Sequence, residues 1–250
     1  MVTDSLAFLG KSFNGPAADV TSLLDAMDGL RIEQVVVCPF KPPGYDLLRA
    51  NETVAEAVRS YPDRLIGLAR VDPWQGGEGA MAEVDRCVEE LGLRGIFLHP
   101  WEETFNISGP QVDPIAVAAG RHQIPVVVAA GYPFLSEALQ VGDLASRHPG
   151  VTFIATNGCQ INISGLATYD VHFALKRNPN LFIQTAGVYR QDFLSEVIDE
   201  HGVDRLLFAS GFPLTDPRLE ILRVSGELFD EVTQDAICYE NAQRLFPRPS

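Results

Sequence analysis

Short apolar runs alternate with amphipathic segments along the whole sequence, and this alternation constrains the fold more than any other feature. Each run is four to six residues long, rich in β-branched or large apolar residues, and does not alternate cleanly with polar ones. Such runs are typical of parallel strands that are buried on both faces of a sheet. The runs occupy residues 34–38, 64–69, 95–99, 125–129, 151–155, 181–185 and 205–209, and a weaker one lies at 5–9.

The segments between the runs carry apolar residues at helical spacing, and Gly or Pro marks most of their ends. Eight strand–helix units of roughly 31 residues each predict an α/β fold, a (β/α)8 TIM barrel that forms a single domain over residues 1–250. No GxGxxG or GxxxxGK[ST] motif follows a run, which weakens the case for a nucleotide-binding open sheet. The expected helices cover residues 18–30, 47–61, 79–91, 114–122, 133–148, 166–177 and 191–201, followed by a helical tail from 217 onward.

The balance of charges narrows the choice of partners. The chain has 19 Lys and Arg against 33 Asp and Glu, a net charge of −14, which argues against nucleic acid or an anionic membrane. No run of 18 apolar residues is present, and the first residues, MVTDSLAFLG, lack the basic segment of a secretory signal. The four Cys form no CxxC motif, which indicates free thiols. We therefore expect a cytoplasmic protein that binds a small-molecule substrate.

The five histidines divide by their positions relative to the strands. In barrels of this kind the active site lies at the C-terminal ends of the strands, and His99 stands at such an end. Its ring can titrate near neutral pH; the alternative is a core histidine that hydrogen-bonds a neighbouring loop. His122, His148 and His201 lie in the last turns of expected helices, where a cation interacts favourably with the helix dipole. His172 lies inside a helical segment with no polar partner at metal-ligand spacing.

Metal sites and nucleophilic sites have little support in the sequence. A catalytic metal needs several His, Asp or Glu side chains that converge, whereas the strand ends offer one His and scattered carboxylates. There is no GxSxG motif. Cys38 and Cys159 follow strands, so a Cys–His pair with His99 is geometrically possible, but a small buried apolar role is favoured for each Cys. The sequence predicts no metal and no other cofactor.

Five motifs in order along the chain resemble one known family. They are RLIGLARVDP (64–73), LGLRGIFLHP (91–100), IPVVVAAG (124–131), ASGFPLTDP (209–217) and ENAQRLF (240–246). They resemble the amidohydrolase-related family, which contains aminocarboxymuconate-semialdehyde decarboxylase, related aromatic-acid decarboxylases and various hydrolases. The resemblance implies a (β/α)8 barrel with a metal at its C-terminal face, which agrees with the independent count of strands.

The sequence departs from this family where the resemblance implies metal ligands. The family opens with Asp-x-His-x-His, but here Leu6 and Phe8 stand at the two His positions. The His expected after the fifth strand falls on Ala129, the His after the sixth on Thr156, and the Asp after the eighth on Gly211. None of these side chains can replace its ligand, so we expect a barrel that has given up its metal.

Two functions remain open. The first is a metal-independent hydrolase, lyase or cyclase, in specialised biosynthesis, acting on a small apolar or aromatic carbonyl or carboxylate substrate. In it His99 acts as general acid or base, while Asn157 and Thr156 stabilise developing negative charge. Six further side chains are expected to line the substrate site: Phe8, Lys41, Arg70, Trp101, Tyr132 and Gln184.

The second function is a pseudoenzyme that binds a small molecule or a protein partner without turnover. It is suggested by the loss of all five implied ligands without an obvious replacement triad. Because related barrels are commonly dimers, the resemblance also implies a possible homodimer.

Overall fold

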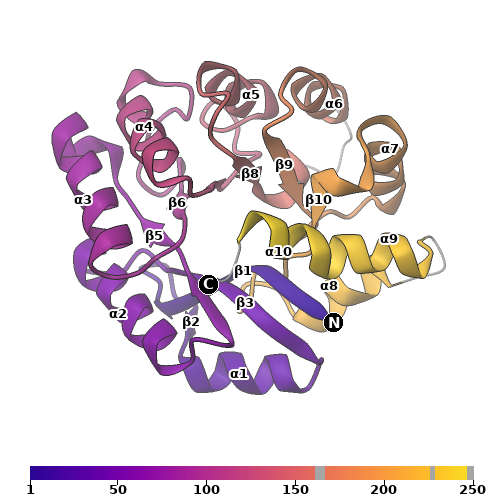
Figure 1. The fold of residues 1–250 in the computed structure, drawn as a ribbon, viewed down its shortest axis with the longest axis horizontal. Helices are drawn as coiled ribbons and strands as arrows, with labels where there is room; N and C mark the ends of the chain where they lie inside the picture. The colour runs from indigo at the N-terminus through magenta and orange to yellow at the C-terminus, as the bar shows by residue number, and fades with distance from the viewer. Residues whose placement is uncertain (161–166, 226–228, 247–250) are drawn as a thin grey trace.

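The barrel strands form a continuous ring at the centre of the molecule (Figure 1). The computed structural model describes residues 1–160, 167–225 and 229–246. Within these residues eight parallel strands follow one another around the ring, one of them split in two at Leu68. The strands are β1 (Val2–Lys11), β3 (Ile32–Pro39), β4 (Leu65–Gly67) continued by β5 (Ala69–Arg70), β6 (Ile96–Leu98), β7 (Val126–Val128), β8 (Phe153–Ala155), β9 (Leu181–Gln184) and β10 (Leu206–Leu207). A two-residue strand, β2 (Ala17–Ala18), pairs antiparallel with the end of β1.

The ring closes between its first and last strands. Ala7 of β1 forms a parallel bridge with Phe212, beyond β10. The Ser5 amide donates to the Phe208 carbonyl at 2.9 Å, and the Gly211 amide donates to the Leu6 carbonyl at 2.9 Å. The sheet therefore has no open edge between β1 and β10, and the predicted (β/α)8 barrel is confirmed.

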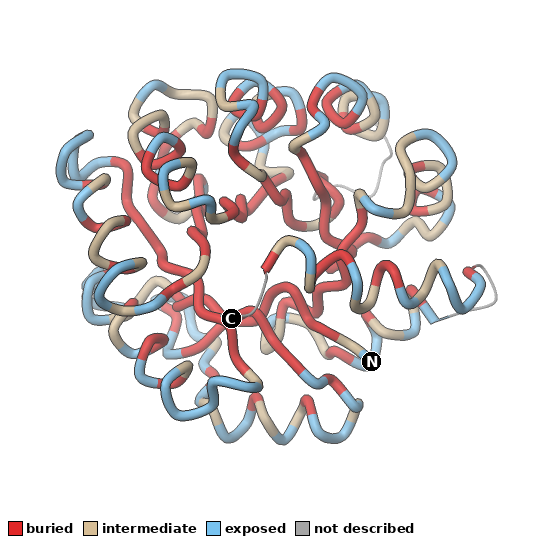
Figure 2. The backbone as a smooth tube through the Cα atoms, viewed as in Figure 1, coloured by how far each residue is buried: buried red, intermediate tan, exposed pale blue. Residues whose placement is uncertain are grey.

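Helices surround the ring, and most of them bury one face against it (Figures 1 and 2). Their buried residues recur at helical spacing, as an amphipathic pattern requires. Most of the expected helices are present within about two residues of their predicted ends. The helices are α1 (Val20–Asp28), α2 (Leu47–Ser60), α3 (Gly77–Glu89), α4 (Asp113–His122), α5 (Ala138–Arg147), α6 (Thr168–Arg177), α7 (Gln191–His201), α8 (Pro217–Val224), α9 (Glu231–Asp235) and α10 (Asn241–Leu245).

Some predicted boundaries were wrong. The helix expected from residue 133 begins at Ala138, because Leu135 and Ser136 donate to the Tyr132 carbonyl and close a turn first. The tail from 217 is not one helix: it contains α8, α9, a π-helical segment (Ala236–Glu240) and α10. The predicted start of the sixth helix at Leu166 lies outside the described residues. No helix in the described part of the chain is long and apolar enough to cross a membrane.

Alternation along the strands separates two layers of core. Val36, Phe97 and Val127 point into the barrel, whereas their neighbours on the same strands pack outward against the helices. The barrel is thus a packed core, as expected for eight strands. Open space lies near the C-terminal ends of the strands, above these interior side chains.

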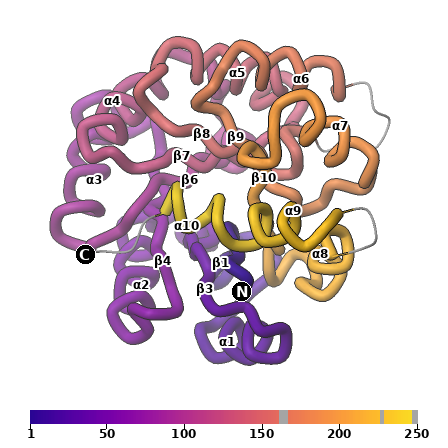
Figure 3. Tube along the Cα trace, turned by 45° about the vertical axis from the view of Figure 1, so that its right-hand side comes forward, coloured from indigo at the N-terminus to yellow at the C-terminus, as the bar shows by residue number. Residues whose placement is uncertain are grey.

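The C-terminal helix covers the opposite end of the barrel. Figure 3 shows α10 lying across β1. Gln243 donates to Thr3 and Gln34 at 3.1 and 2.6 Å, and Asn241 donates to the Leu206 carbonyl at 2.8 Å. These partners lie at the N-terminal ends of their strands, and Phe246 is buried in the interior core. The N-terminal end is therefore plugged, and access to the interior is from the C-terminal side.

Candidate active site at the barrel mouth

A cavity of about 290 Å³ lies at the C-terminal ends of the strands. Residues from six of the barrel strands or their following loops contribute to it, as in other barrels whose sites are built from βα-loops. Five of the nine predicted site residues line it: Phe8, His99, Tyr132, Thr156 and Asn157.

The five positions at which the resemblance implies metal ligands converge on this one cavity. Leu6 and Phe8 enter from β1, Ala129 from the end of β7, Thr156 from the end of β8, and Gly211 from beyond β10. Their side chains make its floor largely apolar. The geometry of a metal centre is therefore present in the fold, but the side chains there are those of a hydrophobic pocket.

His99 borders the cavity as a neutral ring. Burial and the nearby cations Arg70 and Lys41 lower the pKa of His99 well below its ordinary value. The Glu102 amide donates to Nδ1 of His99 at 3.3 Å. Because Nδ1 accepts this bond, the proton of the neutral ring resides on Nε2. This N–H lies at the border of the cavity, where Nε2 is 3.7 Å from Oε1 of Glu102.

Arg70 and Lys41 are held behind the cavity by their own partners. The Arg70 side chain is fully buried and donates through Nη2 to Glu103 at 2.8 Å and also to Glu102. Burial raises the pKa of Glu103 to about 7, against the lowering effect of Arg70. Lys41 donates to the Glu102 carbonyl and lies 4.1 Å from the centre of the Tyr45 ring. Neither cation is among the residues that line the cavity.

The two other predicted contacts are also outside the lining. Gln184 is fully buried inside the barrel, where its amide donates to the Ser5 carbonyl at 2.9 Å and to the Ser5 hydroxyl at 2.8 Å. Trp101 is 59% exposed and stacks on Tyr132 with 5.8 Å between the ring centres. Trp101 therefore extends the aromatic surface at the rim of the cavity. Gln184 instead links two strands of the barrel through its hydrogen bonds to Ser5.

A tight turn after β8 presents Thr156 and Asn157. The Thr156 hydroxyl accepts a hydrogen bond from the Ala130 amide at 3.0 Å, which ties this turn to the end of β7. Asn157 has φ 55° and ψ 34°, in the left-handed region that Asn tolerates better than most residues. A turn held in this way fixes polar side chains at the mouth of the cavity.

Sequence reasoning missed several polar residues of the lining. Gln160, Tyr189 and Thr215 border the cavity from the loops after β8, β9 and β10. Each lies several residues beyond the end of its strand, so a search restricted to the strand ends does not reach it. The sequence signal that could have found them is the length of the segments between these strands and the following helices, which leaves room for a loop over the cavity.

The fold and this mouth define a class of protein, a (β/α)8 barrel whose site is built from the loops after its strands. The chain matches the family model described as amidohydrolase over residues 12–248, and it belongs to that family. This confirms the resemblance carried by the five motifs.

Two curated relatives illustrate the particular branch that this chain resembles. Gamma-resorcylate decarboxylase of Rhodococcus jostii is 24% identical over 253 residues, covering 79% of this chain and 75% of the relative. The enzyme of the same name from Rhizobium radiobacter is 23% identical with the same coverage.

Solved structures show the same fold. A 2,6-dihydroxybenzoate decarboxylase, in complex with 2,6-dihydroxybenzoate, has a TM-score of 0.78 at 18% identity and covers 98% of this chain and 99% of its own. A 5-carboxyvanillate decarboxylase from Novosphingobium aromaticivorans, in complex with manganese and a nitrobenzoic acid, has a TM-score of 0.78 at 15% identity, covering 98% and 96%.

The cavity lining does not fit a cation such as manganese. Hard divalent cations take several oxygen ligands, and transition metals add imidazole. Of the five converging residues only Thr156 has an oxygen atom in its side chain. This hydroxyl oxygen already accepts a hydrogen bond from the Ala130 amide. Among the described residues, groups of three potential ligands lie elsewhere, at His172, Glu200 and His201 and at Asp85, Glu89 and His122. A single imidazole, His99, does not make a metal site.

Proposed function

We propose that this chain is a metal-independent lyase of the amidohydrolase family that acts on a small aromatic carboxylate or carbonyl compound. One observation carries the proposal: the cavity pairs a neutral histidine donor, His99, with apolar side chains at the positions implied for metal ligands. The similarity to decarboxylases of aromatic acids supports the lyase class and the aromatic substrate.

The aromatic side chains favour a flat ring as ligand. Phe8 meets Phe97 edge to face at 5.6 Å between ring centres, and Tyr132 continues the surface through its stack on Trp101. Aromatic pairs of this kind stabilise a further ring that packs against them. A volume of about 290 Å³ is at the small end of ligand cavities, which suits a single substituted ring.

His99 acts in this proposal as a hydrogen-bond donor rather than as a proton donor. A phenolic proton of the substrate first moves, by way of water, to the ring carbon that bears the carboxylate, so that the phenol oxygen becomes a conjugated carbonyl. The bond between this carbon and the carboxylate then breaks, its electron pair moves through the ring onto the carbonyl oxygen, and CO₂ leaves. The N–H of His99 bonds this oxygen more strongly as negative charge grows on it. The phenolate that results takes a proton from water, and the proton already on the ring carbon stands where CO₂ was lost. The Thr156 hydroxyl and the Asn157 amide are further donors at the same mouth.

The charged groups near the cavity favour loss of a carboxylate. Because Glu102 and Glu103 hold Arg70, and Lys41 donates to a carbonyl, no Lys or Arg lines the described cavity. A substrate carboxylate would therefore sit without a cationic partner, which disfavours the charged ground state relative to neutral CO₂.

The experiment uses protein freed of metal by chelation and incubated with 2,6-dihydroxybenzoate and 5-carboxyvanillate, with CO₂ release followed over time. We expect turnover without added metal, and a loss of about 100-fold to 1000-fold in kcat for His99→Gln. His148→Gln is the matched control, because His148 pairs with Asp113 outside the cavity and its replacement leaves turnover unchanged. Turnover that returns only with added manganese contradicts the metal-independent mechanism.

The alternative of a binding barrel without turnover is tested in the same experiment. A ligand that binds at the mouth but is recovered unchanged, with His99→Gln weakening only its affinity, supports the pseudoenzyme. The predicted homodimer and cytoplasmic location stay predictions.

A further inference from the structure

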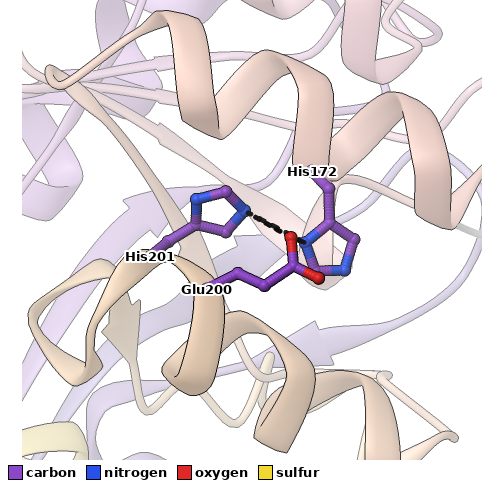
Figure 4. Close-up of side chains that lie close together, drawn as sticks. All are labelled: His172, Glu200 and His201. Atoms are coloured by element: carbon purple, nitrogen blue, oxygen red, sulfur yellow. Dashed lines mark hydrogen bonds and ion pairs between the residues drawn. The ribbon is translucent and has the colours of Figure 1, made fainter.

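Three side chains with metal-binding atoms converge where α6 lies beside α7, outside the barrel mouth (Figure 4). Nδ1 of His172 lies 3.0 Å from Nε2 of His201. Oε2 of Glu200 lies 3.3 Å from His172 Nδ1 and 3.9 Å from His201 Nε2. Two nitrogens and one carboxylate oxygen from two helices therefore face one point.

These separations of 3.0, 3.3 and 3.9 Å lie within about half an ångström of the ligand spacing of a tetrahedral zinc site. Zinc bonds to imidazole nitrogen and carboxylate oxygen are about 2.0–2.2 Å long, so tetrahedral ligands lie roughly 3.3–3.5 Å apart. The three measured distances bracket this range. Zinc sites with three protein ligands keep a water or a substrate atom in the fourth position.

The residues around the cluster hold the two imidazole rings in place and leave the cluster open to solvent on one side. The side chains of His172 and His201 are 14% and 6% exposed, while Glu200 is 61% exposed and leaves the cluster accessible from solvent. Phe193 packs edge-on against His172 at 5.7 Å. Glu196 lies 3.7 Å from Nε2 of His172, on the side where metal-binding histidines commonly meet a carboxylate.

The second three-ligand group of the described residues differs in charge. This group consists of Asp85, Glu89 and His122. The guanidinium of Arg121 lies 3.1 Å from the Asp85 carboxylate and already neutralises it. In addition, His122 bonds the same carboxylate at 2.7 Å. The ion pairs that Glu200 makes are with the two histidines themselves. Lys176 and Arg205 act on His201 from a distance, but no Lys or Arg of the described residues forms an ion pair with Glu200. The Glu200 carboxylate is therefore open to a divalent cation.

We propose that His172, Glu200 and His201 form a binding site for a divalent transition-metal cation of the zinc class. The cation joins the middle of α6 to the C-terminal end of α7, and water or a further ligand takes the fourth position. The site is independent of the cavity at the barrel mouth and of the reaction proposed there.

The test is a calorimetric titration of chelator-treated protein with ZnCl₂, with a parallel titration by Co²⁺ whose visible absorption reports tetrahedral nitrogen and oxygen ligands. We expect one cation per chain and a higher Tm in its presence. His172→Gln and His201→Gln each abolish this binding, whereas His148→Gln, which removes a histidine of similar exposure, leaves it unchanged.

Two further variants distinguish the α6–α7 cluster from the barrel mouth and from a folding defect. Glu200→Gln changes an exposed side chain that folding does not require, and we expect it to weaken zinc binding at least tenfold. His99→Gln is expected to bind zinc as the unsubstituted chain does; loss of binding in this variant places the cation at the barrel mouth and overturns the proposal. Absence of binding to the unsubstituted chain, or unchanged binding in His172→Gln and His201→Gln, also overturns it.

Discussion

The barrel mouth and the edge of the molecule where α6 lies beside α7 differ in their capacity to bind a metal ion. At the mouth the fold brings together five positions where the family resemblance implies ligands, and the side chains there are Leu6, Phe8, Ala129, Thr156 and Gly211. At the edge, two helices outside the catalytic face bring two imidazoles and a carboxylate within 3.9 Å. A shared architecture therefore does not determine where a metal binds; the donor atoms that converge do.

The two regions also differ in what surrounds their charges. Near the mouth, three charged residues are almost fully buried: Asp4, Arg70 and Glu103. Arg70 pairs with Glu103, and Asp4 accepts a hydrogen bond from the Ser210 amide. At the edge, Glu200 is largely exposed. We therefore expect substitutions at the mouth to alter the free energy of unfolding strongly, and substitutions at the edge to alter metal binding but not folding.

Val127→Asp is expected to have the largest effect. Val127 is fully buried inside the barrel just below the cavity, so the substitution buries a charge without a partner. We expect a loss of about 4 kcal/mol or more in the free energy of unfolding, measured by urea denaturation. Val117→Asp is the control, because Val117 on α4 is 48% exposed, and we expect it to change stability by less than about 0.5 kcal/mol. Similar values for both variants contradict the strand register.

Arg70→Met is expected to cost about 3–5 kcal/mol, because it leaves Glu102 and the buried Glu103 without their cation. The same denaturation measurement checks it. Arg49→Met removes an exposed arginine that pairs with Glu52 on α2, and we expect an effect below about 1 kcal/mol. A mild effect of Arg70→Met indicates that the carboxylates find other partners.

Asp4→Asn is expected to change the pH dependence of stability. Burial raises the pKa of Asp4 from 3.8 to about 6, although hydrogen bonds from Ser210 oppose the rise. Between these values the folded chain binds more protons than the unfolded chain, so this carboxyl favours folding below about pH 4 and loses that contribution as the pH rises through about 6. We expect Asp4→Asn to remove up to about 3 kcal/mol of this dependence. Stability curves for the two chains that run parallel between about pH 4 and 7 contradict the buried, raised-pKa carboxyl.

Glu200→Gln is expected to have the smallest effect on folding. In metal-free protein the exposed carboxylate contributes little, so we expect a change below about 0.5 kcal/mol in the free energy of unfolding. With zinc present, the unsubstituted chain gains stability that this variant lacks. A large loss in metal-free protein means that the three side chains stabilise the α6–α7 contact without a cation.

Much of the barrel could be predicted from local pattern. The apolar runs at 95–99, 125–129 and 151–155 became β6, β7 and β8, because strands buried on both faces must be apolar throughout. The position of His99 followed from its place after such a run. The partners of Lys41 and Arg70 could not be predicted, since Glu102 and Glu103 reach them from a loop 32 to 61 residues away in sequence.

His172 shows the same limit at the edge of the molecule. Its segment contains no ligand at metal-binding spacing, and its partner His201 lies 29 residues later at the end of α7, next to Glu200. A side chain on one helix can be matched to a neighbour on another only when the helices are placed side by side.

The sequence by itself determined the kind of fold and the chemistry that each strand end could offer. Periodicity of apolar residues acts within a few residues, so it specified the strands and the helices, while the family resemblance implied that Leu6, Phe8 and Ala129 stand at positions of metal ligands. Only the tertiary structure decided which polar groups meet. Closure of the ring placed His99 as a neutral donor at an apolar mouth, enclosed Arg70 behind it, and left His172, Glu200 and His201 together on the outer surface. The reason is physical: hydrogen bonds and ligand bonds form over about 2–3 Å, and residues far apart in the chain reach that distance only after the barrel has formed.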